Sequence, residues 1–186
     1  DEGYMGNIQY ALIEKSQTAT APQGSNDPRG IEANSSDDEF VPETEAVLAN
    51  VTIIGGPVNN NSDSTNGQQP GMRLRGAVQT TIFNSAVSDF DTGCVRIDDA
   101  DVNGDGTLIE VSTIALVNVL GDCTDGIYDK RPADTEENVE ELVLTYSDTL
   151  AIQQSAAQLT AAPTINAVSN GSGFVFDQTD FVGAVD

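Results

Sequence analysis

The feature that most limits the possible folds is a series of short apolar runs of alternating polarity, concentrated in residues 49–99. Apolar side chains there recur at every second position, which places them on one face of a strand. The pairs are Val51 and Ile53, Met72 and Leu74, and Val95 and Ile97. Each run is too short for an ordinary helix and is bounded by Gly, Asn, Asp or Ser. The sequence therefore predicts many short strands.

The spacing of these runs indicates how the strands are arranged. The sequence GMRLR over residues 71–75 is followed by GCVRI over residues 93–97, with an Asn-containing strand between them. A spacing of about twenty residues is typical of one coil of a parallel β-solenoid. We predict a mainly all-β fold, a right-handed parallel β-solenoid or β-helix with long acidic loops. An antiparallel β-sandwich is the alternative.

The chain has 186 residues, and we expect a single solenoid domain over residues 1–186. Residues 7–16 predict a strand with apolar side chains on both faces, as in a strand covered on both sides. Residues 17–45 are rich in Pro, Ser, Asp and Glu and predict a polar excursion from the core. The strand pattern resumes over residues 46–56, and a second polar loop follows over residues 58–71.

The second half of the chain is less regular. Residues 107–120 are rich in β-branched side chains at period two and predict a strand, with a short helix over 112–120 as the alternative. We expect a C-terminal helix and strand segment over residues 135–186. Ala, Leu and Gln favour a helix between 135 and 160, and a further strand is the alternative there. Residues 174–186 predict a closing strand or an extended segment.

The charge balance excludes several classes of partner. The formal net charge is −23, from 30 acidic and 7 basic residues. Nucleic acid and anionic membrane surfaces require clustered Lys and Arg, so neither is an expected partner. No run reaches the ~20 apolar residues of a membrane span, so no membrane insertion is expected. Because the first residues already predict a strand, we expect the chain to be a processed piece of a longer protein.

One motif indicates a metal ion. Asp101, Asn103 and Asp105 occupy alternate positions, Gly106 is the sixth residue, and Thr107 is the seventh. This pattern is the first half of a calcium loop, in which hard oxygen ligands converge on one ion. The twelfth position is a serine rather than glutamate, and Glu110 is the nearest acidic residue. A tight turn without a metal is the alternative, because Asn-Gly and Asp-Gly favour turns.

The two cysteines, Cys94 and Cys123, flank this motif. In an acidic chain of extracellular character, two cysteines predict a disulfide. Two buried free thiols are the alternative. The chain has no histidine, which removes the usual general base and histidine-ligated metals.

Arginines provide the main case for enzymatic chemistry. A polysaccharide lyase on a β-solenoid needs a base, for which Arg73, Arg75 and Arg96 are the candidates. Arg73 and Arg75 alternate with Met72 and Leu74 and are expected to point outward. Exposed arginines that pair with neighbouring acidic residues are the simpler interpretation, and we favour it. No catalytic residue and no organic cofactor is predicted.

Several phrases together suggest a family. The residues NVTIIGG, GMRLRG, TIFNSAVSDFDTGCVRIDD and FVFDQTDFVGAVD resemble a group of secreted or surface-exposed bacterial proteins. These proteins combine a right-handed parallel β-helix region with a C-terminal Phe/Tyr-x-Gly-Ala-Val signature. The likeness covers residues 46–123 and 174–186. It implies a fold and an extracellular or cell-surface location, and no active site, because members of the group have no assigned function.

These observations predict a non-catalytic extracellular structural protein, such as a surface, matrix or filament subunit. Both ends of the solenoid are expected to be uncapped, which favours self-association or contact with neighbouring protein chains. A polysaccharide is a further candidate partner. The alternatives are a carbohydrate-active enzyme, either a polysaccharide lyase or a glycoside hydrolase, and a glycan-binding adhesion module.

Overall fold

The structure is a computed structural model. It describes residues 3–15, 29–35, 41–56, 62–63, 67–76, 78–98, 113–124, 126 and 164–184. Within these residues there are eleven strands and no helix. The described part is therefore all-β, as predicted.

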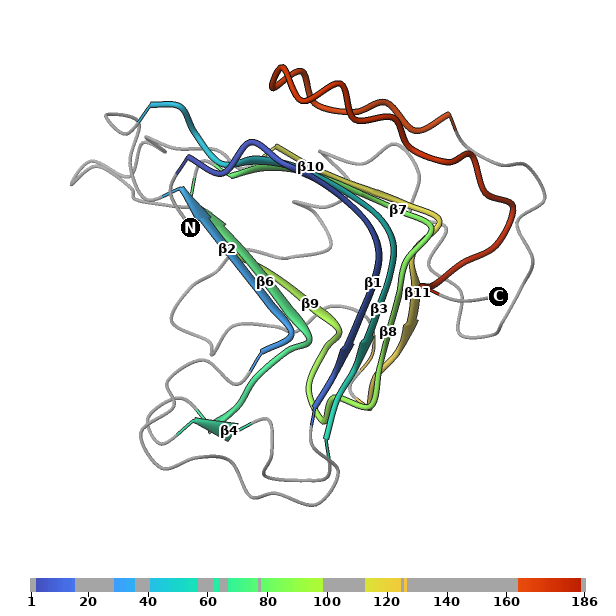
Figure 1. Cartoon of the computed structure of the whole chain (residues 1–186). Coiled ribbons are helices and arrows are strands. Elements are labelled where there is room, and N and C mark those ends of the chain that lie inside the picture. The colour runs from blue at the N-terminus through green and yellow to red at the C-terminus, as the bar shows by residue number, and fades with distance from the viewer. Residues whose placement is uncertain are drawn as a thin grey trace.

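The larger sheet, called sheet A, is built from strands that stack in parallel (Figure 1). From β3 onward, corresponding positions recur 34 residues apart, as at Asn84 and Asn118, whereas β1 pairs with β3 at an offset of 40. In register, Val47 lies beside Thr81, and Thr81 lies beside Ala115. The strands of sheet A are β1 (Asn7–Glu14), β3 (Glu45–Ile54), β7 (Gln79–Phe83), β8 (Ala86–Ser88), β10 (Thr113–Val117) and β11 (Leu120–Asp122).

The second sheet, called sheet B, is also parallel and has the order β2-β6-β9. Its strands are β2 (Ile31–Ser35), β6 (Met72–Gly76) and β9 (Val95–Asp98). Met72 pairs with Val95, so the two similar phrases predicted to be one coil apart do lie side by side. A small antiparallel pair, β4 (Ser62–Asp63) and β5 (Gly67–Gln68), lies between β3 and β6 in the chain.

We use the word coil for one passage of the chain through sheet A and then sheet B. The first coil contains β1 and β2, the second β3 and β6, the third β7, β8 and β9, and the last described coil contains β10 and β11. The strands of both large sheets pair in parallel, which excludes the antiparallel sandwich. Figure 1 shows sheet A bending around a corner and sheet B forming a further side.

The corner of sheet A is made by one residue per coil in a left-handed backbone conformation. These residues are Tyr10, Asn50, Asn84 and Asn118, with φ values of 62°, 50°, 46° and 56°. Asparagine tolerates this conformation better than most residues. The bend also shifts the strand parity, so that Ile8, Ala11 and Ile13 all pack toward the core. The bend therefore turns residues of both parities inward, while Tyr10 and Leu12 stay 43% and 55% exposed. The strand predicted to be covered on both sides is thus only partly covered on its outer face.

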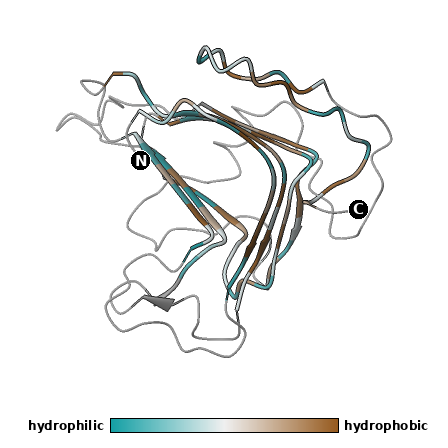
Figure 2. Ribbon diagram, in the orientation of Figure 1, coloured by the Kyte–Doolittle hydropathy of each residue, from teal (hydrophilic) through white to brown (hydrophobic). Residues whose placement is uncertain are grey.

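The hydrophobic core lies between the two sheets, whose strands show brown segments mixed with teal ones in Figure 2. Leu48, Ile82 and Leu116 each point into the core two residues before a corner asparagine. Val51 and Val87 point into the core after the corners at Asn50 and Asn84. Stacking identical faces in parallel buries continuous apolar rows, which is how solenoids stabilise repeats that could not fold alone.

Several predictions for single segments need correction. Residues 31–35, inside the expected polar excursion 17–45, form β2. Residues 113–117 form β10, so the alternative of a helix over 112–120 is wrong. The predicted helix between 135 and 160 lies outside the described residues. The described part of the C-terminal phrase, residues 174–184, contains no strand, so the expectation of a closing strand is wrong there.

The two ends of the described stack differ. The core-facing side chains of the last coil are almost fully buried: Ile114, Leu116 and Val119 are 1%, 0% and 2% exposed. In the first coil, Ile8 and Ile13 are only partly buried. The sequence predicted two uncapped ends. Among the described residues, apolar core-facing side chains are left partly exposed at the first coil and not at the last.

Candidate functional site

Four of the seven basic residues gather on and beside sheet B. They are Arg29, Arg73, Arg75 and Arg96. In register, Glu32 of β2 lies beside Arg73 of β6, and Arg73 lies beside Arg96 of β9. Because strand side chains alternate between faces, this row points away from the core while Leu74 and Ile97 point into it. The outward placement predicted for Arg73 and Arg75 is confirmed, because they are the partly exposed positions of β6.

Glu32 forms ion pairs with three of these arginines. Glu32 lies 3.3 Å from Nη1 of Arg29, 3.6 Å from Nη1 of Arg73 and 3.7 Å from Nη1 of Arg75. Arg29 is buried and also donates a hydrogen bond to the side-chain oxygen of the buried Gln69. Arg75 has the most accessible side chain of these ion pairs, at 41% exposure. The face combines fixed guanidinium groups with one that can reach solvent.

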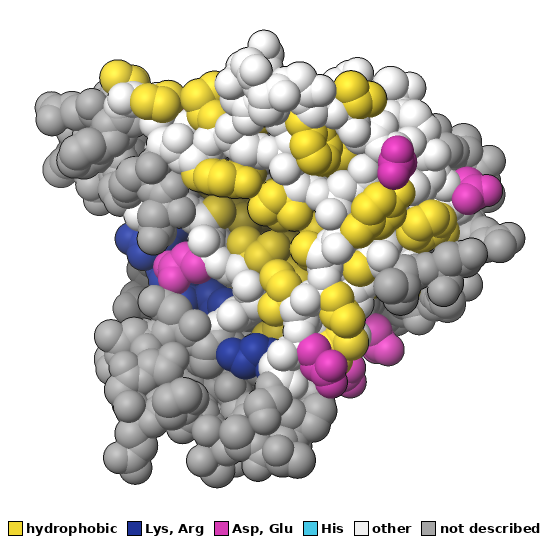
Figure 3. All heavy atoms as spheres, in the orientation of Figure 1, with side chains coloured by type: hydrophobic (Ala, Val, Ile, Leu, Met, Phe, Trp, Pro, Cys, Tyr) yellow, Lys and Arg dark blue, Asp and Glu magenta, His cyan; other side chains and the backbone are white. Residues whose placement is uncertain are grey.

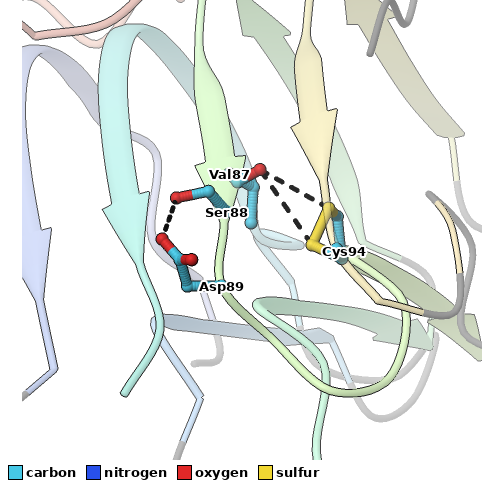
Figure 4. Close-up of a disulfide and its surroundings, with 5 residues drawn as sticks. Val87, Ser88, Asp89 and Cys94 are labelled. Atoms are coloured by element: carbon cyan, nitrogen blue, oxygen red, sulfur yellow. Dashed lines mark hydrogen bonds between the residues drawn. A yellow bond between two sulfur atoms is a disulfide. The ribbon is translucent and has the colours of Figure 1, made fainter. Parts of the chain in front are cut away.

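The predicted disulfide between Cys94 and Cys123 is present, with a Cα–Cα distance of 5.6 Å. It joins the start of β9 to the end of β11, so it ties the third coil to the fourth. The carbonyl oxygen of Val87 lies 3.5 Å from one sulfur and 4.0 Å from the other (Figure 4). These are close contacts, because disulfide sulfurs carry no proton to donate.

The predicted calcium ligands lie outside the described residues. They are Asp101, Asn103, Asp105, Thr107 and Glu110. The strands on either side are placed, because β9 ends at Asp98 and β10 begins at Thr113. Among the described residues, no group of three or more acidic, histidine or cysteine side chains could hold a metal ion. The calcium site stays a prediction.

Corner asparagines and a C-terminal segment form a polar network that the sequence analysis missed. Asn84 donates from Nδ2 to the hydroxyl of Thr179 (3.1 Å), and Asn118 donates to Oδ1 of Asn84 (3.5 Å). Asn50 donates to the carbonyl of Phe181 (3.2 Å). Asn50 and Asn84 are fully buried. The corners of successive coils are thus linked to one another and to residues 164–184.

The same segment also binds β1 through paired side-chain and backbone hydrogen bonds. Asn7 donates to the carbonyl of Val168 (3.1 Å) and accepts from its amide (2.7 Å). Gln9 makes the equivalent pair with the backbone of Asp177, at 2.9 Å each. Figure 1 shows the segment passing along the outside of sheet A. The outer face of sheet A is therefore partly covered by the chain itself.

Tyr10 stands where the other coils carry asparagine. Its ring stacks on Phe181 with centroids 6.4 Å apart, and its hydroxyl donates to Oδ2 of Asp177 (3.0 Å). Desolvation, then the hydrogen bond to Asp177 and the charge of that carboxylate, raise the pKa of Tyr10 above its ordinary value. The C-terminal segment is therefore held by a tyrosine in its neutral form.

A hollow opens into the core at the first coil. Its volume is about 180 Å³, and Figure 3 shows yellow apolar side chains within the hollowed face. Both sheets contribute to its lining. From sheet A come Ile8, Ala11 and Ile13 of β1, and Ile31 and Ala33 of β2 line it from sheet B. The strand β1 at its rim pairs with β3 and has no second partner among the described strands.

A family model described as the pectate-lyase-like β-helix domain matches residues 1–171. The chain belongs to this family. Membership confirms the predicted β-helix region, and it agrees with parallel stacking in both sheets. No curated protein and no solved structure matches the chain. In the described part, no helix is both long enough and apolar enough to cross a membrane.

Within this β-helix domain, the corner residues could have been found from the sequence. The phrases EAVLANVTI, QTTIFNSAV and TIALVNVLG begin at residues 45, 79 and 113 and share an asparagine at the sixth position. A self-comparison of the chain at a period of 34 residues would have aligned them. The hollow has no comparable sequence signal, because it depends on how deeply the core-facing side chains of the first coil are buried.

Proposed function

We propose that this β-helix domain is a non-catalytic extracellular structural module that joins a second copy of the chain through its open first coil. The observation that carries the proposal is the difference between the ends: the last described coil is buried, whereas the first presents a partly buried apolar face. Among the described strands β1 has one partner, β3, and an open strand edge favours pairing with another chain. The disulfide supports an oxidising, extracellular setting.

The fold proposed for this role is the closed, right-handed form of the β-solenoid. The parallel register of both sheets and the family match support it. In such a fold the first coil exposes a cross-section of the core, so contact with another first coil buries apolar surface on both copies. One open end favours a two-fold contact that closes on itself over an open filament.

The net charge of −23 opposes association of like chains, so salt must influence it. At physiological ionic strength charges are screened beyond about 8 Å. The rim of the hollow is mainly apolar, and its acidic residue Glu32 is paired with arginines. We therefore expect self-association to strengthen as salt is raised from low to physiological concentration.

Light scattering over a wide concentration range tests this proposal. We expect the mass to rise with protein concentration, and Ala11→Lys at the mouth of the hollow to shift the chain toward monomer. The variant should still fold, because its long side chain can reach solvent from the open face. Thr124→Lys, an exposed position after β11 in the last coil, is the matched control. A wild-type monomer at all concentrations, or equal effects of the two substitutions, contradicts the proposal.

The non-catalytic part of the proposal has its own test. Incubation with a panel of acidic polysaccharides should yield no new reducing or unsaturated ends. Either product would contradict the proposal, because lyases leave unsaturated ends and hydrolases leave reducing ends.

A second candidate function, binding of an acidic polysaccharide, is supported by the arginines of sheet B. They concentrate positive charge on one face of a strongly acidic domain of a pectate-lyase-like family. Arginine forms strong hydrogen bonds to carboxylates, and Arg75 is accessible. Affinity electrophoresis in gels containing pectate should show retardation that Arg75→Ala reduces and Lys15→Ala does not. Equal mobility with and without pectate would contradict this candidate.

A further inference from the structure

Strand β1 is the one described strand of sheets A and B that contains no buried residue. Its partner β3 is buried throughout residues 46–51. Among the described strands, β1 pairs with β3 alone. Segments with little buried apolar surface open locally at a small fraction of the free energy of global unfolding. The docking of β1 onto β3 therefore depends strongly on contacts outside the core and the backbone ladder.

Those contacts come from residues 164–184, which we call the strap. Asn7 and Gln9 are two residues apart, so both side chains point to the outer face of β1. Asn7 donates to the carbonyl of Val168 and accepts from its amide, and Gln9 forms the same pair with the backbone of Asp177. We call these two pairs the amide clamps. They hold β1 from the face that the core does not cover.

The strap itself is anchored on later coils by apolar contacts. Its side chains Ile165 and Phe176 are 4% and 3% exposed. They pack against Val47 and Ala49 of β3, and Phe83 of β7 borders the same cluster. Among the described residues this cluster contains no member of β1. The strap therefore does not need β1 in order to stay on sheet A.

A second anchor lies at the end of the strap, where the Gly-Ala-Val phrase begins. The amide of Gly183 donates to the carbonyl of Asn84 (2.8 Å), and the amide of Ala184 donates to the hydroxyl of Thr52 (2.8 Å). Gly183 has φ of 94°, and a Cβ atom there would lie 2.9 Å from the Thr52 hydroxyl, so glycine is required. These contacts fix the strap to the second and third coils.

The two clamps belong to one rigid unit. Figure 1 shows the strap, in orange and red, folding back on itself beside sheet A. The side chain of Gln178 ties its two arms together, because it accepts from the amide of Ile165 (3.0 Å) and donates to the carbonyl of Ile165 (3.2 Å). Val168 lies on one arm and Asp177 on the other. Both clamps on β1 should therefore form and break together.

We propose that the strap controls the first coil by switching β1 between a docked and an open state. With both amide clamps formed, β1 lies on β3; with both broken, β1 opens while the strap stays on the second and third coils. Only docked β1 presents a strand edge to a second copy, so the strap sets the fraction of chains that can associate. This consequence rests on the proposed function, whereas the control of β1 does not.

Amide hydrogen exchange of Asn7→Asp at neutral pH tests the switch, at a protein concentration where the chain is monomeric. The aspartate keeps the acceptor but loses the donor and faces the carbonyl of Val168, so exchange throughout β1 should be faster by about tenfold. Exchange in β10 should be unchanged. Asn166→Asp is the matched control, because it adds the same charge at an exposed position of the strap. Unchanged exchange in β1, or an equal rise in β10, overturns the proposal.

A double-mutant cycle tests whether the strap carries the effect. Phe176→Ala removes an apolar anchor and should also speed exchange in β1, whereas Val175→Ala, at an 83% exposed position, should not. If both substitutions act through the strap, Asn7→Asp should add little in the Phe176→Ala background. Phe176→Leu serves if Phe176→Ala does not fold. Full additivity, or a Phe176 effect confined to β3 and β7, overturns the proposal.

Light scattering separates this inference from the proposed function. If both hold, Asn7→Asp should self-associate more weakly than wild type, and Asn166→Asp should associate as wild type does. A wild-type chain that stays monomeric contradicts the proposed function, and the exchange measurements still decide the role of the strap. Faster exchange in β1 with unchanged association supports the switch and contradicts association through the first coil.

Discussion

At the scale of single residues, the corner asparagines determine how each coil turns. Asn84 adopts a left-handed conformation, is fully buried, and bonds to Thr179 and Asn118. Its side chain therefore satisfies two requirements at once. It tolerates the bend, and it supplies polar groups that pair with the next coil and with the C-terminal segment.

Replacing Asn84 by alanine should lower the free energy of unfolding by about 3 kcal/mol. Roughly 1–2 kcal/mol comes from forcing alanine into a left-handed conformation, and the rest from unpaired buried groups. Asn84→Gly keeps only the second cost, so its loss should be smaller by about 1 kcal/mol. Denaturant unfolding measures both. If both variants lost the same free energy of unfolding, the left-handed backbone conformation would make no separate contribution to stability.

Tyr10 predicts a specific response to alkaline pH. Its pKa is raised in the folded chain, so the neutral form is favoured there and its contribution to stability is fully present below the ordinary pKa of about 10. That contribution is lost as pH rises through the raised value. Between pH 8 and pH 11, wild type should lose more stability than Tyr10→Phe in denaturant melts. Parallel pH profiles for the two proteins would contradict this.

At the scale of elements, the disulfide holds the last described coil to the one before it. It closes a loop of 29 residues, for which the chain-entropy model gives roughly 3.6 kcal/mol of stabilisation. A variant with both Cys94→Ala and Cys123→Ala should unfold at lower denaturant concentration by up to this amount. Amide exchange should rise first in β10 and β11. Uniform loss of protection across β1 to β11 would contradict a local role.

The sequence predicted the elements whose apolar alternation was strongest. The strands near residues 7–16 and 46–56, and the pairing of β6 with β9, are present. The strand β2 was missed because Ile31 and Ala33 are its only apolar residues and lie within a polar stretch. The corner at Tyr10 was missed because the shift of parity that it causes was interpreted as one strand with two apolar faces. Comparison at a period of 34 residues would not have found it, because β1 pairs with β3 at an offset of 40.

The candidate site was less predictable than the fold. The alternation in residues 71–75 placed Arg73 outward, but the ion pairs of Glu32 require β2, which was not expected. The hollow required two facts that sequence does not contain. Tyr4 lies over Gly6, and the core-facing side chains are buried in the last described coil but partly exposed in the first.

At the scale of the whole molecule, the excess negative charge makes bound cations important. The predicted calcium loop over residues 101–110 lies between β9 and β10. If Asp101, Asn103 and Asp105 bind calcium, ligand binding to the folded state alone should raise the melting temperature. Thermal melts with millimolar calcium and with chelator should then differ, and Asp105→Asn should reduce the difference. Coincident melting curves for wild type would contradict calcium binding to the folded chain.

The claim that the first coil joins another chain is tested most directly by amide hydrogen exchange in β1, measured at low and high protein concentration. We predict that the amides of β1 that point away from β3 become protected as concentration rises, while protection in β10 stays constant. Exchange in β1 that is the same at every protein concentration would contradict association through the first coil.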